Sequence, residues 1–521
     1  MGLPSKKLII HIGMPKTGSS AIQALFALNE AYFKSKGIVF PWYDGFTQSY
    51  QTSGGNAELL LKWMSSQDRR AFDQAISALN ETTVVISSES LFYTFKQDPQ
   101  GFFEFFTGYD FLVICYARDL VQLVDSSLNQ AVKNHGFLVN DENLAHIIED
   151  CYYLDVLSHA AQFVESGNLS VRWYDKTQFG GEGIYADFLQ LIGVTVDLSQ
   201  LTRPNKVVNP SLSPDAFAFR ALLNSFSALP TSDGFKYQIN ALLAQYSVEY
   251  SSSGLVLNEE RIHKIQQSYG VAFERFWKTF WTTEPPAIGQ HAIRSTSNGM
   301  GDADQALCTM AIKKILTFLW QQNPQVLLLI LESFLKSEWA LIDNASKVQR
   351  VVRNALAIEW LRSLSVGKLT DLELQLCGLL RVFLTPTLTL DGNTYPFSVK
   401  DWSEDIGSRS SLGGGLVVES IGNDPFFELI AMDGNSSNTA CWVWLSIQVP
   451  VSGCVQLYYT TTQYPIFSPE KMLNIDVLEG EQSLSFVIDD PEFTGRIRLD
   501  PGSDACIYLI RQLSLYSVYY E

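Results

Sequence analysis

Residues 7–31 read KLIIHIGMPKTGSSAIQALFALNEA. Lys7–Ile12 has the apolar composition of a buried strand, and Ser19–Ala31 carries apolar residues at helical spacing. Residues 13–20, which we call the glycine loop, join the two and place Lys16 between two glycines. A strand that turns at glycines directly into a helix presents free backbone N–H groups, so the stretch predicts a phosphate-binding turn.

The alternation of strand and helix continues after this loop. Strand-like apolar runs occupy Thr83–Ser87, Phe111–Tyr116 and Leu169–Tyr174, and the last two are followed by helical spacing over Leu120–Val132 and Ile184–Leu191. Such alternation is typical of an α/β domain whose parallel sheet is covered by helices on both faces.

The pattern changes in the second half of the chain. Residues 284–304 are rich in Pro, Gly, Ser, Thr and Asn and predict a linker after a domain of residues 1–283. Residues 305–384 have helical periodicity, with a new helix expected to start at Pro324. Short alternating runs over residues 385–521 predict an antiparallel β-sandwich accessory domain.

Composition excludes several classes of partner. The formal net charge of −18 argues against nucleic acid and against an anionic membrane surface, although it allows a local basic site. No apolar run approaches the ~20 residues of a membrane-spanning helix. The 7 cysteines contain no C-x-x-C pair, and no His follows His291, so we expect reduced thiols, no metal site and a cytoplasmic protein.

The glycine loop differs from the loop of nucleotide triphosphatases. That loop needs a Lys directly after its second glycine, whereas here Ser19 follows Gly18 and Lys16 precedes it by two residues. The sequence therefore disfavours a kinase or GTPase. No metal ion is expected either, because no triphosphate has to be neutralised.

The run Lys16-Thr17-Gly18-Ser19-Ser20 resembles the 5′-phosphosulfate loop of sulfotransferases, especially bacterial members. The resemblance covers roughly residues 7–281. It implies that the co-substrate is 3′-phosphoadenosine-5′-phosphosulfate, that these five residues bind it, and that Lys16 neutralises the leaving phosphate.

A second motif follows the strand at Phe111–Tyr116. An Arg at the carboxyl end of a parallel strand, here Arg118, faces the ligand crevice of an α/β sheet and suits phosphate, but it also suits an ion pair with Asp119 or Asp125. Arg118 together with Ser126 resembles the 3′-phosphate motif of sulfotransferases. The family usually has Pro where this chain has Leu120.

Transfer of a sulfuryl group to a hydroxyl requires a base. Glu89 follows the strand at Thr83–Ser87 and resembles the Glu base of some carbohydrate sulfotransferases; the alternative is a helix cap. His11 is the rival base, with a buried core His as its alternative. His135 is a weaker candidate, since a His at a helix end is usually on the surface.

Two further features bear on ligands. Lys206 lies in a segment similar to a late loop of bacterial sulfotransferases and is either another phosphate contact or a solvated residue. The C-terminal region is similar to a β-sandwich appendage of bacterial surface-polysaccharide enzymes, which implies a carbohydrate acceptor. Six of its aromatic residues are candidates for sugar stacking or for the core: Trp402, Trp442, Trp444, Tyr458, Tyr459 and Tyr464.

Together these features predict a sulfotransferase that acts on a hydroxyl of a carbohydrate, related to surface polysaccharide or exopolysaccharide. Lys16, Arg118 and Glu89 are expected to meet at one site, because they follow strands of one parallel sheet. The alternative is a catalytically degenerate donor-binding fold that serves as a glycan-binding or assembly protein, and Leu120 motivates it.

Overall fold

The computed structural model describes most of the chain, and the statements that follow concern the described residues. Its contacts divide the chain into two compact units, residues 1–224 with 243–305 and residues 225–242 with 306–521. The second unit thus includes residues 225–242, which the sequence placed in the N-terminal domain. The described ranges are 6–14, 16–42, 55–165, 167–175, 183–194, 198–203, 211–226, 228–250, 254–286, 288–289, 309–336, 351–352, 356–364, 369–384, 386–390, 399–412, 415–430 and 439–519.

The first unit contains a parallel sheet of five strands in the order β2-β3-β1-β4-β5. The predicted α/β class and parallel sheet are confirmed, with each predicted strand present to within two residues at either end. The two-residue strand β2 is an addition that the sequence did not predict. The strands are β1 (Lys7–Ile12), β2 (Ile38–Val39), β3 (Thr83–Ser88), β4 (Asp110–Ala117) and β5 (Leu169–Trp173).

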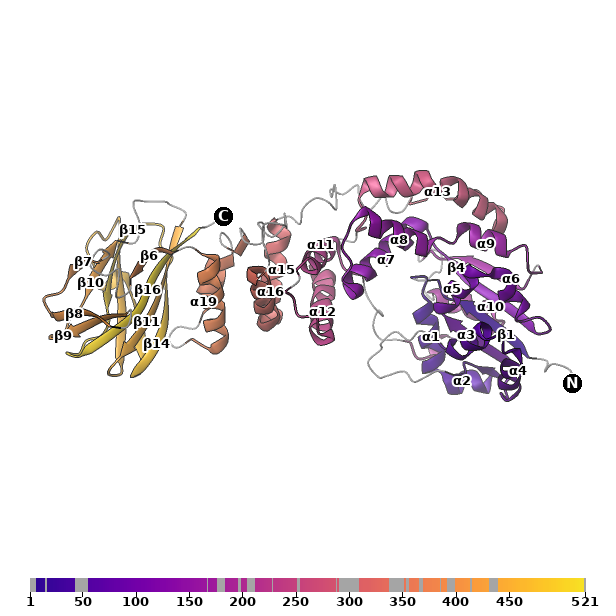
Figure 1. Ribbon diagram of the computed structural model, residues 1–521, viewed down its shortest axis with the longest axis horizontal. Coiled ribbons are helices and arrows are strands. Elements are labelled where there is room, and N and C mark those ends of the chain that lie inside the picture. The colour runs from indigo at the N-terminus through magenta and orange to yellow at the C-terminus, as the bar shows by residue number, and fades with distance from the viewer. Residues whose placement is uncertain are drawn as a thin grey trace. The chain divides into compact units, whose positions relative to one another are not determined.

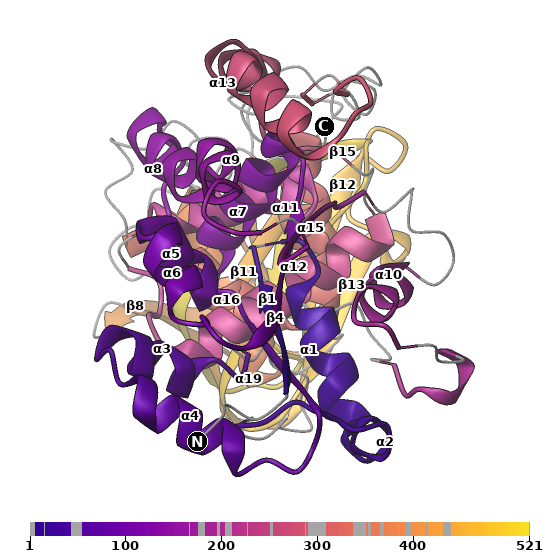
Figure 2. The same ribbon diagram turned by 90° about the vertical axis from the view of Figure 1, so that its right-hand side faces the viewer.

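Helices cover both faces of this sheet (Figure 2). On one face, Ile9, Val85 and Ile114 pack against Phe26 of α1 and Phe188 of α10. Helices α5 and α6 lie on the other face. The helices of the unit are α1 (Ser19–Leu28), α2 (Glu30–Ser35), α3 (Glu58–Ser65), α4 (Arg69–Ser77), α5 (Ser90–Gln97), α6 (Pro99–Glu104), α7 (Leu120–His135), α8 (Asp141–Cys151), α9 (Leu154–Ala160), α10 (Gly183–Leu191), α11 (Pro214–Asn224), α12 (Asp233–Tyr250, shared with the second unit) and α13 (Glu259–Phe280).

A buried side chain completes the edge of the sheet beside β3. Strand β2 pairs with β3 only as far as Val84, and beyond that point Asn56 takes over the pairing. Its Nδ2 donates to the carbonyl oxygens of Pro41 and Val85 (2.8 and 3.0 Å), and its Oδ1 accepts from the Ser87 N–H (2.7 Å). Asn56 therefore fixes the end of β3 from which Glu89 leaves the sheet.

We predict that Asn56→Ala destabilises the first unit by about 3 kcal/mol, because it leaves three buried backbone groups without their partner. Chemical unfolding measures the free energy, and hydrogen exchange at the Ser87 amide reports the local effect. The exposed Asn80→Ala is the matched control, with an expected change within about 0.5 kcal/mol. Equal unfolding curves for the two variants would contradict this role of Asn56.

The second unit combines helices with two antiparallel sheets (Figure 1). Helix α16 starts at Pro324, as predicted. Helix α19 lies within the predicted helical segment of residues 305–384, and a capping box of Thr370 and Glu373 marks its start. Its described helices outside the shared α12 include α15 (Thr309–Gln322), α16 (Pro324–Lys336), α18 (Ala357–Arg362) and α19 (Asp371–Phe383). Most of the predicted linker, residues 284–304, lies outside the described residues.

The two sheets enclose one apolar core, which confirms the predicted β-sandwich. One sheet has the order β13-β12-β15-β10-β7, and the other β14-β11-β16-β9-β8, with β6 paired to β16. Leu457 and Ile497 of the first sheet pack in the same cluster as Val443 and Leu513 of the second. The strands are β6 (Pro386–Leu390), β7 (Val399–Trp402), β8 (Ile406–Leu412), β9 (Gly415–Ser420), β10 (Phe427–Ile430), β11 (Thr439–Val449), β12 (Gly453–Thr461), β13 (Met472–Val477), β14 (Gly480–Ile488), β15 (Phe493–Asp500) and β16 (Ile507–Tyr519).

Candidate functional site

The carboxyl ends of β3, β1 and β4 lie next to one another, since these strands are adjacent and parallel. Ile12 at the end of β1 is in register with Ser88 on one side and with Cys115 on the other. The N–H of Gly13 then donates to the carbonyl oxygen of Ser88 at 3.0 Å. The glycine loop, the residue after β3 and the residue after β4 therefore start from the same edge of the sheet.

The glycine loop has a left-handed backbone at two positions. Lys16 has φ 63° and Gly18 has φ 86°. A Cβ at Gly18 would lie 2.9 Å from Cδ1 of Ile184, so the position requires glycine. For Lys16 the left-handed conformation costs about 1 kcal/mol, which neighbouring contacts must offset.

The hydroxyl groups of the loop have different surroundings. Oγ1 of Thr17 is buried and donates to the Met14 carbonyl oxygen at 2.8 Å, so it closes the turn. Ser19 is also buried, whereas Ser20 is half-buried in the first turn of α1. Gly18 is the N-cap of α1 and offers no side chain to the first N–H groups of the helix.

The Glu89 carboxylate is directed to the glycine loop. Its Oε1 accepts a hydrogen bond from Oγ of Ser19 at 2.8 Å. Glu89 occupies the N-cap position of α5, but its side chain forms no capping hydrogen bond there. Of the two alternatives for Glu89, the helix-cap interpretation thus lacks its contact, and the carboxylate lies beside the loop.

The Arg118 guanidinium binds the backbone of the same loop. Its Nη1 donates to the Lys16 carbonyl oxygen at 2.9 Å, and its Nε donates to Gln122 Oε1 at 3.2 Å. Asp119 and Asp125 accept hydrogen bonds from backbone N–H groups, and among the described residues neither forms an ion pair with Arg118. The ion-pair alternative for Arg118 is therefore not what the structure has.

The charges of Glu89 and Arg118 both act on the Lys16 ammonium group. Burial lowers the pKa of Lys16, while Glu89 raises it and Arg118 lowers it further. Burial also lowers the pKa of Arg118. Glu89 and Arg118 are thus each close enough to Lys16 to affect its charge, while the charges of Asp125 and Asp119 act on Arg118.

Most of the remaining predicted residues lie on helix α7. Ser126 is half-buried on α7, about two turns after Arg118. Leu120, the departure from the family pattern, is fully buried at the start of this helix, which Asp119 caps, so the departure leaves the helix start intact. His135 is exposed at the end of the helix. Lys206 lies outside the described residues.

His11 is a core residue. It has no exposed surface, its Nδ1 lies 2.8 Å from Oγ of Ser87, and its ring meets Tyr116 and Phe188 edge to face. Burial lowers its pKa to about 3. A ring without exposed surface cannot contact an acceptor hydroxyl, so the geometry favours the core alternative over the predicted role as a base.

We predict that His11 makes the first unit acid-sensitive. Because its folded pKa of about 3 lies below the unfolded value of 6.5, stability is lost as pH falls below 6.5. Between pH 7.5 and 5.0 the free energy of unfolding of the wild type should fall by about 2 kcal/mol more than that of His11→Asn. Chemical unfolding measures both values. Exposed His146→Asn is the control and should behave as the wild type. Parallel pH profiles for wild type and His11→Asn would rule this out.

Two residues near the loop escaped the sequence prediction. Tyr174 follows β5; its N–H donates to the Ala117 carbonyl oxygen, and its ring lies 5.7 Å from the Arg118 guanidinium. Lys133 of α7 is only 6% exposed and interacts electrostatically with Lys16. Tyr174 could have been identified from the sequence, because it stands at the end of a predicted strand.

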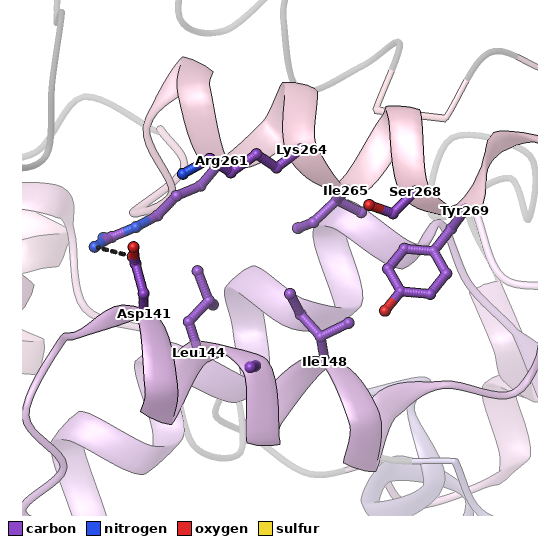
Figure 3. A pocket seen from close by; sticks show the side chains of 9 residues that line it. Asp141, Leu144, Ile148, Arg261, Lys264, Ile265, Ser268 and Tyr269 are labelled. Atoms are coloured by element: carbon purple, nitrogen blue, oxygen red, sulfur yellow. Dashed lines mark hydrogen bonds and ion pairs between the residues drawn. The ribbon is translucent and has the colours of Figure 1, made fainter.

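A pocket of ≈ 230 Å³ lies between α8 and α13 (Figure 3). Leu144, Ile148 and Ile265 give it apolar walls, and Arg261 approaches Asp141 at 3.5 Å on its rim. None of the predicted site residues lines this pocket, so it is separate from the constellation around Lys16.

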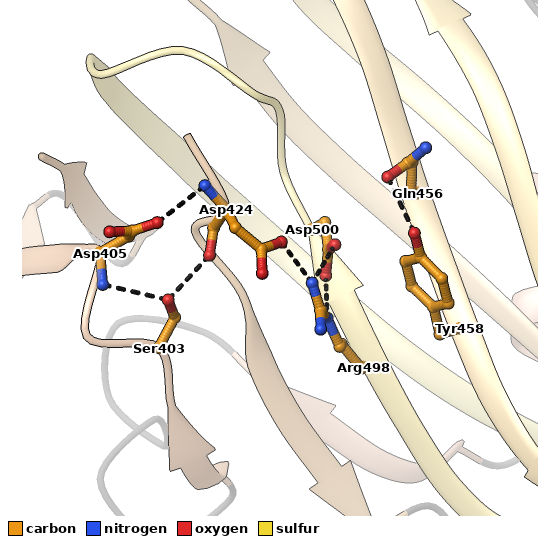
Figure 4. A network of polar contacts seen from close by, with 7 residues as sticks. All are labelled: Ser403, Asp405, Asp424, Gln456, Tyr458, Arg498 and Asp500. Carbon is orange, nitrogen blue, oxygen red and sulfur yellow. Dashed lines mark hydrogen bonds and ion pairs between the residues drawn. The ribbon is translucent and has the colours of Figure 1, made fainter. Parts of the chain in front are cut away.

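In the second unit, a polar network surrounds Arg498 (Figure 4). Its guanidinium binds Asp424 and Asp500 and lies 3.8 Å from the ring centroid of Phe426 and 5.0 Å from that of Tyr458. Of the six aromatic candidates, Trp442 and Trp444 are buried, Trp402 and Tyr459 pack against the sandwich core, and Tyr458 and Tyr464 are partly exposed.

Two kinds of feature are absent from the part of the chain that the structure describes. The described residues include no group of three or more His, Cys, Asp or Glu side chains placed to hold a metal ion. Within the same ranges, no helix combines the length and hydrophobicity that crossing a bilayer requires.

Comparison with known proteins yields structural likenesses at low identity and no family. No known family profile and no curated protein matches the sequence. Among solved structures, the chain is similar to the apo CBM1 module of BiXyn10A, with 9% identity and a TM-score of 0.19 over 25% of this chain and 98% of that one. A family 29 carbohydrate-binding module from Piromyces equi has 14% identity and a TM-score of 0.19 over 26% and 91%. Likenesses this low assign neither a family nor an activity.

Proposed function

We propose that this chain is a sulfotransferase that moves a sulfuryl group from 3′-phosphoadenosine-5′-phosphosulfate to a hydroxyl of a carbohydrate in the cytoplasm. One observation carries the proposal: the Lys16 loop, Arg118 and Glu89 come together at adjacent strand ends, with Arg118 bonded to Lys16 and Glu89 bonded to Ser19. The constellation supplies cations for two phosphates and a carboxylate for a proton.

In the proposed reaction, the N–H groups at the start of α1 and the Lys16 ammonium bind the 5′-phosphosulfate, while Arg118 and Ser126 bind the 3′-phosphate. The acceptor oxygen attacks sulfur opposite the bridging oxygen. A new S–O bond forms as the bond to the 5′-phosphate breaks, and the electron pair of that bond stays on the phosphate. Glu89 accepts the hydroxyl proton, and Lys16 balances the charge on the leaving phosphate.

The Ser19 hydroxyl has a positioning role in this scheme. Its hydrogen bond to Oε1 holds the Glu89 carboxylate beside the loop that would bind the donor. The other carboxylate oxygen is the atom to which we assign the acceptor proton. This geometry links donor binding and proton removal through one contact.

We predict that Lys16→Met and Glu89→Gln each lower kcat by about 100-fold or more, in an assay of radiolabelled donor with a panel of oligosaccharides. Glu89→Gln should leave the affinity for adenosine 3′,5′-bisphosphate nearly unchanged, because the base does not bind the nucleotide. Exposed Lys62→Met is the matched control and should keep the wild-type rate.

The transfer assay and the bisphosphate affinity together separate the competing interpretations. If Glu89→Gln keeps most of its rate, Glu89 is not the base. If the wild type binds the bisphosphate tightly but transfers sulfate to no acceptor, the degenerate donor-binding fold replaces the enzyme. If it does not bind the bisphosphate at all, the proposed function fails.

A further inference from the structure

The two outer faces of the β-sandwich have different surroundings. On the sheet that contains β11 and β16, Arg381 of helix α19 donates to Gln512 Oε1 at 2.6 Å and lies 5.3 Å from the ring centroid of Trp444. Trp442 on the same face is fully buried and stacks on Tyr516. This face therefore packs against helix α19.

The outer face of the other sheet, which contains β12 and β15, carries polar side chains. Leu457 packs in the sandwich core, and because side chains alternate along a strand, its neighbours Gln456 and Tyr458 point outward. Pairing with β15 sets Gln456 opposite Asp500 and Tyr458 opposite Arg498 (Figure 4). Two adjacent strands therefore place these four side chains on one surface.

The Arg498 guanidinium is held in place from several directions. Its Nε and Nη2 each donate to the Asp500 carboxylate at 2.8 Å, and Nη2 also contacts Asp424. The rings of Phe426 and Tyr458 lie against it, and only 18% of the Arg498 side chain is exposed. A long side chain fixed in this way has little conformational entropy left to lose when it binds a ligand. We call the following set the outer patch: Asp424, Gln456, Tyr458, Arg498 and Asp500.

Two hydrogen-bond donors of the outer patch remain available. Among the described residues, Nη1 of Arg498 has no acceptor, although Nε and Nη2 of the same group do. Gln456 accepts from the Tyr458 hydroxyl at 3.3 Å through Oε1, and its Nε2 has no partner within the same ranges. The Asp424 side chain is 61% exposed and supplies acceptor oxygens next to them. The patch thus offers donors and acceptors beside an aromatic ring.

The charge of the outer patch argues against an anionic ligand. Its network joins one guanidinium to three carboxylates: Asp405, Asp424 and Asp500. The nearby Arg496 is itself paired with Glu428 at 3.0 Å. A phosphate or sulfate group would therefore meet a surplus of negative charge. A neutral ligand rich in hydroxyl groups fits better, because each hydroxyl both donates and accepts, and the C–H face of a pyranose packs on an aromatic ring.

We propose that the outer patch binds a neutral carbohydrate chain. The Tyr458 ring packs against one pyranose unit, Arg498 Nη1 and Gln456 Nε2 donate to its hydroxyl groups, and Asp424 accepts from one of them. A protein partner suits the patch less well, since the centre of a protein interface is depleted in charged residues. The site lies in the second unit and uses none of the residues around Lys16, so it stands apart from the transfer reaction.

The test is native affinity electrophoresis of the full chain, without nucleotide, in gels that contain a neutral glucan, galactan or mannan, a sulfated galactan, or a polyuronate. At least one neutral polysaccharide should retard the wild type. Tyr458→Ala should weaken that affinity about tenfold or more, because the ring is lost, and Gln456→Ala about fivefold, because one hydrogen bond is lost. Tyr237→Ala is the matched control, at a tyrosine of α12 that is 69% exposed, and should keep the wild-type affinity.

A further variant separates loss of the ring from loss of the fold. Tyr458→Phe keeps the ring, so its affinity should stay within about threefold of the wild type. Thermal unfolding of both Tyr458 variants checks that the sandwich is folded. Equal losses of affinity in the two variants would contradict the packing of a sugar on this ring.

Retardation that the patch variants reduce and Tyr237→Ala does not reduce supports the proposal. The proposal is overturned if no neutral polysaccharide retards the wild type, if only the sulfated galactan or the polyuronate does, or if the patch variants keep the wild-type affinity. A dimer in sedimentation that Tyr458→Ala dissociates would assign the surface to a second copy of the chain instead. Because the gels contain no nucleotide, these results do not depend on whether the chain transfers sulfate.

Discussion

The hydrogen bond from the Gly13 N–H to the Ser88 carbonyl oxygen is the contact on which the candidate site depends. It extends the β1–β3 pairing past the end of β1 and brings the glycine loop against the residue that follows β3. A Cβ at Gly13 would lie 2.9 Å from Cβ of Ser19 and 3.2 Å from the Glu89 nitrogen, so a side chain here would push the loop away. The meeting of Ser19 and Glu89 thus depends on a position that has no side chain.

Strand register explains how a chain of net charge −18 can build a cationic site. The adjacent ends of β1 and β4 bring Lys16 and Arg118 together at one edge of the sheet. Nearby carboxylates are held by other groups, since Asp119 and Asp125 accept from backbone N–H groups. Burial makes the charged forms of Lys16 and Arg118 less favourable. A bound phosphate would lower the free-energy cost of keeping both groups charged.

How far the sequence predicts this structure depends on how local each signal is. The strands β1, β3 and β4 were predicted because uninterrupted apolar runs mark a strand that is buried on both faces. Strand β2 has two residues and no such run, and the role of Asn56 beside it arises from tertiary contacts. Lys16, Glu89 and Arg118 were found because each follows a predicted strand and stands in a stretch that resembles sulfotransferases. Lys133 was not found from the sequence, because its electrostatic interaction with Lys16 joins residues more than a hundred positions apart.

Arg118 has two roles, one in supporting the glycine loop and one that we assign to ligand binding. Its bond to the Lys16 carbonyl oxygen stabilises a left-handed residue that would otherwise cost about 1 kcal/mol, so the guanidinium supports the loop before any ligand arrives. The same group is the one we assign to the 3′-phosphate. Removing Arg118 therefore confuses loss of a loop contact with loss of a ligand contact, and its mutation alone is weak evidence for binding. Ser126 lies on helix α7 and takes no part in that bond, so a change at Ser126 reports on the ligand more directly.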